Sequence, residues 1–146
     1  MNIYRYLLFL SLALFCCACE DVDGDCSKIQ SYELPHECNL KIEENKVVYV
    51  ENMKEFEYLF DGYTKVPRVN FKNSKLLLVK GKACQGVQEI KKQLTKIDEG
   101  YELVIEVYLN LTMKITPWCI GYIIPRTEEM GYVNLKIDYI DFQGKN

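Results

Sequence analysis

Residues 101–115, YELVIEVYLNLTMKI, are the stretch of sequence that decides the fold. Every odd-numbered position from Tyr101 to Ile115 is apolar, and only Val104 and Tyr108 interrupt the polar even-numbered set. A period of two sends alternate side chains to opposite faces of a β-strand. The pattern therefore predicts either one long bent strand or two strands, with one face buried.

The segments around this stretch extend the pattern into a sheet. Residues 118–124 continue the alternation up to Pro125, and residues 133–139 repeat it. The apolar run at 76–79 is typical of a strand that is covered on both faces. Residues 46–51 and 87–97 are also expected to be strands, with a tight turn at 98–100.

One helix is expected early in the domain. Asn52 and Glu55 form a capping-box pattern, and Gly62 ends the segment. The apolar residues between them share one helix face: Met53, Phe56, Leu59 and Phe60. The sequence thus predicts a mainly β, α+β fold, in which an antiparallel sheet of about six strands is rolled or sandwiched and the helix packs on it.

The first residues have the form of a lipoprotein signal peptide. Residues 1–18 combine a single basic residue, Arg5, with an apolar run that is too short for a permanent membrane anchor. Ala18 before Cys19 is small enough for a signal peptidase, so Cys19 is the expected lipidated residue. The predicted organisation is a signal peptide at 1–18, an acidic tether and N-terminal segment at 19–45, and a β domain at 46–142.

Charge and composition restrict the partners. The acidic run at 20–25, EDVDGD, resembles the signal that directs some Bacteroidetes lipoproteins to the cell surface. We therefore expect an outer-membrane protein held in the lipid bilayer through Cys19 and displayed at the surface. The chain of 146 residues has a formal net charge of −3, which makes nucleic acid an unexpected partner.

Four cysteines follow the lipidated one, and an even number in an exported chain is typical of disulfides. Cys26, Cys38, Cys84 and Cys119 allow three pairings. The favoured pairing joins Cys26 to Cys38 and Cys84 to Cys119, and the alternative leaves Cys84 and Cys119 as small unpaired apolar residues. No C-x-x-C motif is present and His36 is the only histidine, so no metal site is expected.

The sequence contains no recognisable catalytic constellation. The serines of the mature chain lack a nucleophile-elbow setting, and no glycine-rich loop precedes a helix. His36 is only two residues from Cys38, which makes a surface-loop histidine the simpler interpretation. We expect no catalytic residue and no cofactor. A less favoured hypothesis is a cysteine enzyme that uses a reactive thiol at Cys84.

Aromatic residues favour a binding role. The chain has 11 tyrosines and one tryptophan, and both residue types are common in protein interfaces and sugar-binding platforms. Trp118 and Cys119 must lie on opposite faces of their strand. If Cys119 points inward, Trp118 becomes a contact residue; if Trp118 continues the apolar stripe of 120–124, it belongs to the core.

The order of segments from 47 to 139 resembles the C-terminal domain of the protease-complex stability lipoproteins called PrcB-like. The resemblance rests on the helix KEFEYLF at 54–60, the Pro67-x-Val69-x-Phe71 step, the apolar strand 76–79 and the strand that ends in Ile124-Pro125. The family typically has Gly-Gly-Tyr after the apolar strand. Here that step reads Gln85, Gly86 and Val87, which are candidate partner contacts together with Trp118.

The resemblance implies an accessory lipoprotein without catalytic activity. We therefore expect an envelope-anchored protein-interaction module that stabilises or restrains a partner such as a protease complex. The alternative is a surface glycan-binding lipoprotein that uses exposed tyrosines and Trp118.

Overall fold

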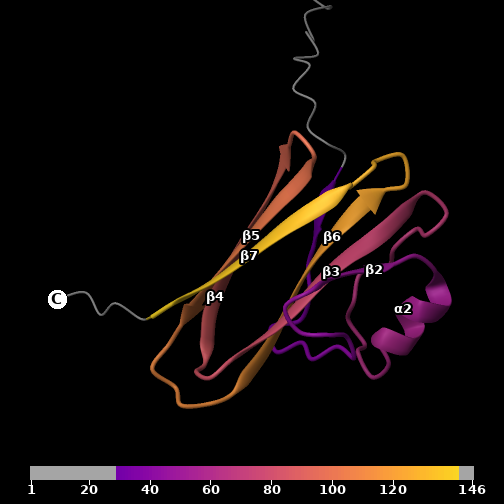
Figure 1. The fold of residues 1–146 in the computed structure, drawn as a ribbon. Helices are drawn as coiled ribbons and strands as arrows, with labels where there is room; N and C mark the ends of the chain where they lie inside the picture. Colours follow the sequence, from indigo (N-terminus) through magenta and orange to yellow (C-terminus); the bar gives the residue numbers. More distant parts are fainter. Residues whose placement is uncertain (1–28, 142–146) are drawn as a thin grey trace, which may run out of the picture.

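The computed structural model describes residues 29–141, which form seven strands and one helix. The strands make two sheets that pack face to face, and the helix covers the outer side of one sheet (Figure 1). The predicted mainly β, α+β fold with a sandwiched sheet is confirmed. The predicted signal peptide, Cys19 and Cys26 lie outside the described residues.

The larger sheet has four antiparallel strands in the order β1-β6-β3-β2. Its long central strands are β3 (Ser74–Ala83) and β6 (Thr116–Pro125), which pair along their whole length. Two short strands form the edges, β1 (Gln30–Tyr32) beside β6 and β2 (Val47–Val50) beside β3.

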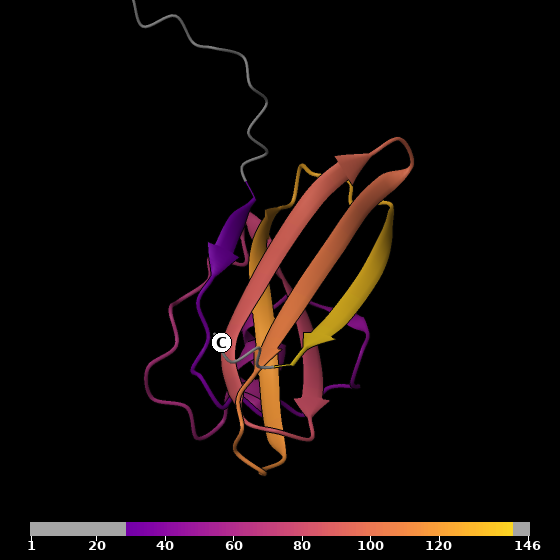
Figure 2. The same ribbon diagram turned by 90° about the vertical axis from the view of Figure 1, so that its left-hand side faces the viewer.

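The smaller sheet has three strands in the order β4-β5-β7. A tight turn joins β4 (Val87–Ile97) to β5 (Gly100–Leu109), as the sequence predicts. The edge strand β7 (Tyr132–Ile140) runs parallel to β5, because the chain crosses to the larger sheet through β6 before it returns. Figure 2 shows this sheet in front of β3 and β6.

The main core lies between the two sheets. The alternation that decides the fold places the odd-numbered side chains of β5 there, and all of them are buried. The single tryptophan joins them and is fully buried. Burial of these apolar side chains supplies the main driving force for folding. The core residues of β5 and β6 are Tyr101, Leu103, Ile105, Val107, Leu109, Trp118, Ile120, Tyr122 and Ile124.

A second core lies on the other side of the larger sheet. Helix α2 (Met53–Leu59) supplies Phe56 to it, and the segments 33–42 and 60–73 close it around the sheet. Leu76 and Leu78 of β3 point into this second core, whereas Leu77 and Val79 point into the main one. The predicted strand with two covered faces is therefore confirmed, and the molecule has three layers.

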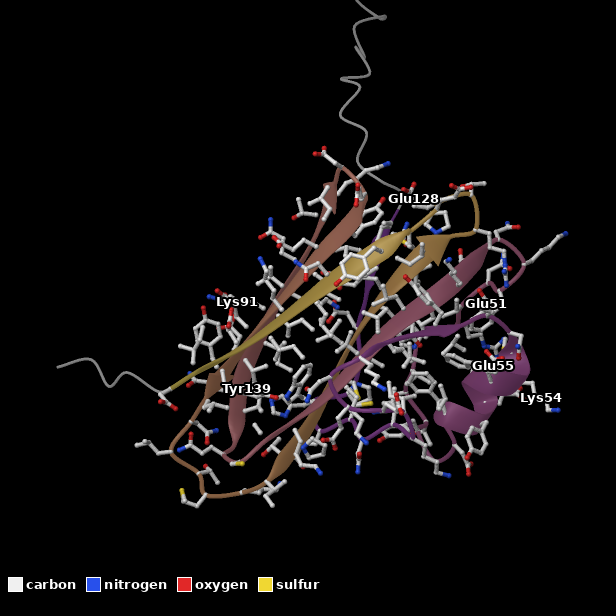
Figure 3. All side chains as sticks on the ribbon, in the orientation of Figure 1. Glu51, Lys54, Glu55, Lys91, Glu128 and Tyr139 are labelled. Atoms are coloured by element: carbon white, nitrogen blue, oxygen red, sulfur yellow. The ribbon has the colours of Figure 1, made fainter. Side chains whose placement is uncertain are left out.

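The capping pattern of helix α2 is also confirmed. The Asn52 side chain accepts a 2.9 Å hydrogen bond from the Glu55 N–H, and the Glu55 carboxylate accepts a 3.1 Å bond from the Glu51 N–H. Figure 3 shows Glu51 and Glu55 together at the start of the helix. The first contact satisfies an amide that a helix start otherwise leaves unpaired, and the second ties the residue before the N-cap to the first turn.

Besides the parallel pairing of β5 with β7, two boundaries differ from the sequence prediction. Strand β5 ends at Leu109, so the apolar positions 111, 113 and 115 belong to a loop and not to a longer strand or to a second one. In addition, the folded body begins before the predicted boundary at residue 46. Strand β1 pairs with β6, and Leu40 is buried in the second core.

Candidate functional site

An exposed apolar loop connects β5 to β6. We call residues 110–115 the apolar loop, because Leu111, Met113 and Ile115 leave 74%, 86% and 65% of their surface exposed. These are three of the most exposed large apolar side chains in residues 29–141. Grouped apolar exposure of this kind marks a contact surface, whereas single exposed apolar residues are ordinary.

Hydrogen bonds hold the apolar loop in a defined shape. The Asn110 N–H donates to the Gly86 carbonyl, and the Gly86 N–H donates to the Thr112 carbonyl, both at 2.8 Å. Within the loop, the Thr112 N–H donates to the Asn110 side chain at 2.9 Å. Lys114 forms a 2.8 Å ion pair with Glu37 of the N-terminal segment. The three apolar side chains are thus presented from a backbone that is already ordered.

The Gln85-Gly86-Val87 step supports this loop. Gly86 is buried, and a Cβ at this position would come within 2.3 Å of the Asn110 side-chain oxygen. Val87 is 5% exposed and belongs to the main core. Gly86 and Val87 are therefore too buried to be the partner contacts that the sequence predicted. Gln85 is the one residue of this step that is partly exposed. Their role is to position the apolar loop.

The apolar loop lies at the end of the sandwich opposite the start of the described chain. Strand β6 runs from Thr116, next to the loop, to Ile123, which pairs with Gln30 of β1. Seven residues of strand span about 23 Å. Figure 1 shows β1 starting at the top of the view and the β5–β6 connection at the bottom.

A shallow groove is the second candidate surface. Its volume is about 220 Å³, which is below the range typical of small-molecule pockets. The residues that line it come from the segment 32–36, from β4 and from β6, and include His36, Glu89, Lys92 and Cys119. The structure thus places the only histidine near a cysteine that is not its sequence neighbour.

Lys92 explains how this groove is built. Its ammonium group donates to the Gly121 carbonyl at 2.8 Å and to the Tyr32 carbonyl at 3.3 Å, and lies 4.8 Å from the ring centre of Tyr122. Burial lowers the pKa of Lys92, and the charge of Glu33 opposes this shift. Because its donors are bound to carbonyls, Lys92 acts as a clamp that joins β4 to β1 and β6.

The cysteines are arranged differently from the prediction. Cys119 pairs with Lys80 in the β3–β6 register, and Cys84 follows the last residue of β3, four residues and about 13 Å beyond Lys80. A disulfide needs Cα atoms within about 7 Å, so the predicted Cys84–Cys119 bond is wrong. Cys84 is an exposed thiol, and Cys119 lies instead beside Cys38 in the second core.

The predicted contact role of Trp118 is also wrong. Its side chain is fully buried against Gly81 and contacts the ring of Tyr139 edge-on, with the ring centres 6.4 Å apart. The interpretation that Trp118 continues the apolar stripe into the core is confirmed. Its indole N–H has no hydrogen-bond partner among the described residues.

Two searches of residues 29–141 concern metals and membranes. In this part of the chain, no three His, Cys, Asp or Glu side chains gather as metal ligands. The helix described there is also too short and too polar to cross a bilayer. No protein-family model, curated protein or solved structure matches the chain. The PrcB-like resemblance therefore rests on the sequence motifs given above.

Sequence reasoning missed both candidate surfaces. The sequence did not indicate that the apolar loop is a loop, because its alternation of apolar and polar residues continues that of β5 without a break. The signal that distinguishes it is the pair of residues Asn110 and Thr112, which favour turns through side-chain bonds to nearby amides. No local pattern reveals the groove, because its walls are far apart in the sequence.

Proposed function

We propose that this chain is an envelope-anchored lipoprotein without catalytic activity, and that it binds a partner protein through the apolar loop. The observation that carries the proposal is the exposure of Leu111, Met113 and Ile115 on a hydrogen-bonded loop. The PrcB-like resemblance suggests a protease complex of the envelope as the partner, which the lipoprotein stabilises or restrains.

The position of the apolar loop favours a protein over the membrane as its contact. A lipid on Cys19 would hold the chain from the side where β1 begins, and the loop lies at the far end of the sandwich. Apolar side chains at the centre of an interface contribute most when neighbouring groups exclude water around them.

The groove supports the absence of catalysis. Interaction with the Cys38 thiol and burial raise the pKa of Cys119, so Cys119 is poorly suited to be the first nucleophile toward a substrate. Lys92 already donates to two carbonyls and is not free to act as a base. Since Trp118 is buried, the glycan-binding alternative loses one of its expected contact residues and retains only the exposed tyrosines.

Site-specific crosslinking in the native host tests the proposal. A photoreactive amino acid at position 113 should give one discrete protein adduct on irradiation. The same amino acid at position 132 is the matched control, because Tyr132 is 68% exposed but lies at the opposite end of β5. A pattern of adducts that is identical at the two positions would contradict a partner site at the apolar loop.

A variant experiment completes the test. The triple substitution Leu111→Ser, Met113→Ser and Ile115→Ser should remove co-purification of the crosslinked partner. The control substitution is Tyr58→Ser, which alters an apolar residue that is 63% exposed on helix α2. Equal recovery of the partner with the triple variant would overturn the proposal, as would robust hydrolytic activity of the purified protein.

A further inference from the structure

Two cysteines from distant parts of the chain meet in the second core. Cys38 belongs to the segment between β1 and β2, and Cys119 belongs to β6. The Cys119 thiol donates a hydrogen bond to the Cys38 carbonyl oxygen at 3.2 Å, and both side chains belong to the second core. Cys38 is fully buried and Cys119 is 7% exposed. Packing of the N-terminal segment on the sheet thus brings the two cysteines together in one core.

The surroundings prepare one of these thiols for reaction. The hydrogen bond from Cys119 lowers the pKa of Cys38, and Tyr63 and the charge of Lys80 act in the same direction. Lys80 is fixed by a 2.9 Å bond to the Leu40 carbonyl. A thiolate beside a second thiol is the arrangement that thiol–disulfide exchange requires, because the thiolate is the nucleophile.

The other described cysteine cannot compete for Cys119. Cys84 lies just past the end of β3, four residues and about 13 Å beyond Lys80, the cross-strand neighbour of Cys119, and its side chain is exposed. Cys26 lies outside the described residues, so a Cys26–Cys38 bond is the competing outcome that an experiment must distinguish.

We propose that Cys38 and Cys119 form an intramolecular disulfide when the exported chain meets a disulfide oxidant. The Cys38 thiolate attacks the oxidant disulfide and forms a mixed disulfide, with release of the first thiol. Cys119 then loses its proton and attacks the Cys38 sulfur, which releases the second thiol. Overall, two protein thiols are oxidised to one disulfide, and one oxidant disulfide is reduced to two thiols.

Such a bond would fasten the N-terminal segment to the central strand of the larger sheet. The segment carries Glu37, which pairs with Lys114 of the apolar loop, and it forms one wall of the groove. Of the two cysteines, only Cys119 lines the groove, and the Cys38 side chain is fully buried behind it. The inference does not depend on the proposed partner, because disulfide formation is measured on the protein alone.

Peptide mapping of the exported protein tests the inference. Full-length protein is purified from membranes after its free thiols are blocked by alkylation, and it is digested without reduction. The expected result is a crosslinked pair of peptides that contain Cys38 and Cys119, together with an alkylated Cys84. Alkylation of both Cys38 and Cys119, or a crosslink between Cys26 and Cys38, would overturn the inference.

An oxidation experiment gives a second, independent result. The variant Cys26→Ser/Cys84→Ser is reduced, freed of reductant and treated with glutathione disulfide. We expect two glutathione molecules released per chain and a protein mass that is lower by two hydrogens. Adding Cys119→Ser to this variant is the matched control, which should leave at most a mixed disulfide on Cys38. A stable glutathione adduct in the variant that retains Cys119 would contradict the inference.

Discussion

The indole of Trp118 occupies the space directly over Gly81, its cross-strand neighbour in the β3–β6 pair. A Cβ at position 81 would lie 2.1 Å from the indole Cζ2 atom, far inside van der Waals contact. The absence of a side chain at Gly81 is therefore what allows the largest side chain of the main core to lie flat between the sheets.

Gly81→Ala should destabilise the protein by about 1–3 kcal/mol, because the fully buried indole has no free space into which to move. Urea unfolding followed by the fluorescence of the single tryptophan measures the loss. Gly121→Ala is the matched control, since its nearest atom would be Tyr32 Cδ1 at 3.1 Å. We expect a smaller loss there, and equal losses would contradict the steric explanation.

Leu109 and Leu111 occupy equivalent positions in the sequence alternation but different environments. Leu109 is 7% exposed in the main core, and Leu111 is 74% exposed in the apolar loop. Leu109→Ala should cost about 2–5 kcal/mol of unfolding free energy through lost burial and the cavity that remains. Leu111→Ala should change it by less than about 0.5 kcal/mol. Similar costs in chemical denaturation would mean that the loop is buried in solution.

Lys92→Met should lower stability by about 1–2 kcal/mol, because it keeps the apolar stem and removes the donor to two carbonyls. Lys91→Met is the neighbouring control on the same strand, where the ammonium lies 4.6 Å from the ring centre of Tyr108 at the surface. Thermal unfolding of both variants should show the larger loss at Lys92. If Lys91→Met lowers stability as much as Lys92→Met does, the bonds from Lys92 to the two carbonyls are not what stabilises the fold.

Stability should fall as the pH rises above about 10. Burial raises the pKa of Tyr32 and of Tyr122 to about 12, and the nearby Cys38 adds to the shift of Tyr32. Each folded-state pKa exceeds the unfolded value of about 10, so the stabilisation is complete below pH 10 and is lost as the pH approaches 12. Each tyrosine contributes roughly 2–3 kcal/mol.

Urea unfolding at a series of alkaline pH values measures this loss. Tyr122→Phe, which keeps the ring and removes the titrating group, should make the fall with pH shallower. The lowered pKa of Lys92 acts in the opposite direction, since it makes stability rise with pH up to its unfolded value of about 10.4. A profile that stays flat up to pH 12 would contradict the assignment of the tyrosines.

Lipidation of Cys19 remains a sequence prediction with a direct test. Mass spectrometry of the protein purified from membranes should show a chain that begins at Cys19 and carries acyl groups. Cys19→Ser should abolish the modification and leave the signal peptide attached, whereas Cys17→Ser should be processed normally. An unmodified, freely secreted chain would contradict the proposed anchoring.

Local sequence patterns predicted the strands and the helix because the apolar residues of each element recur at the spacing of that element. The run 76–79 indicated a strand with two covered faces, and the structure places alternate residues in two different cores. Asn52 and Glu55 indicated a helix start and form the expected bonds. In these segments, local preference and tertiary packing point to the same result.

The features that were not predicted depend on contacts between distant residues. The parallel pairing of β5 and β7 follows from a crossover through the other sheet, and no turn pattern encodes it. The meeting of Cys38 with Cys119 depends on how the N-terminal segment lies across β6. The apolar loop has the apolar–polar alternation of a strand, but its backbone does not continue β5. The Gly86 carbonyl and N–H bond instead to Asn110 and Thr112 of the loop.

Strand β4 forms one open edge of the smaller sheet, and it carries two exposed lysines, Lys91 and Lys96. Charged residues on such an edge oppose pairing with the same strand of another molecule. If the proposed lipid anchor confines copies of the chain to a membrane surface, like-charged edges would keep neighbouring molecules from assembling into continuous sheets. The lysines would thereby leave each copy available to bind its partner separately.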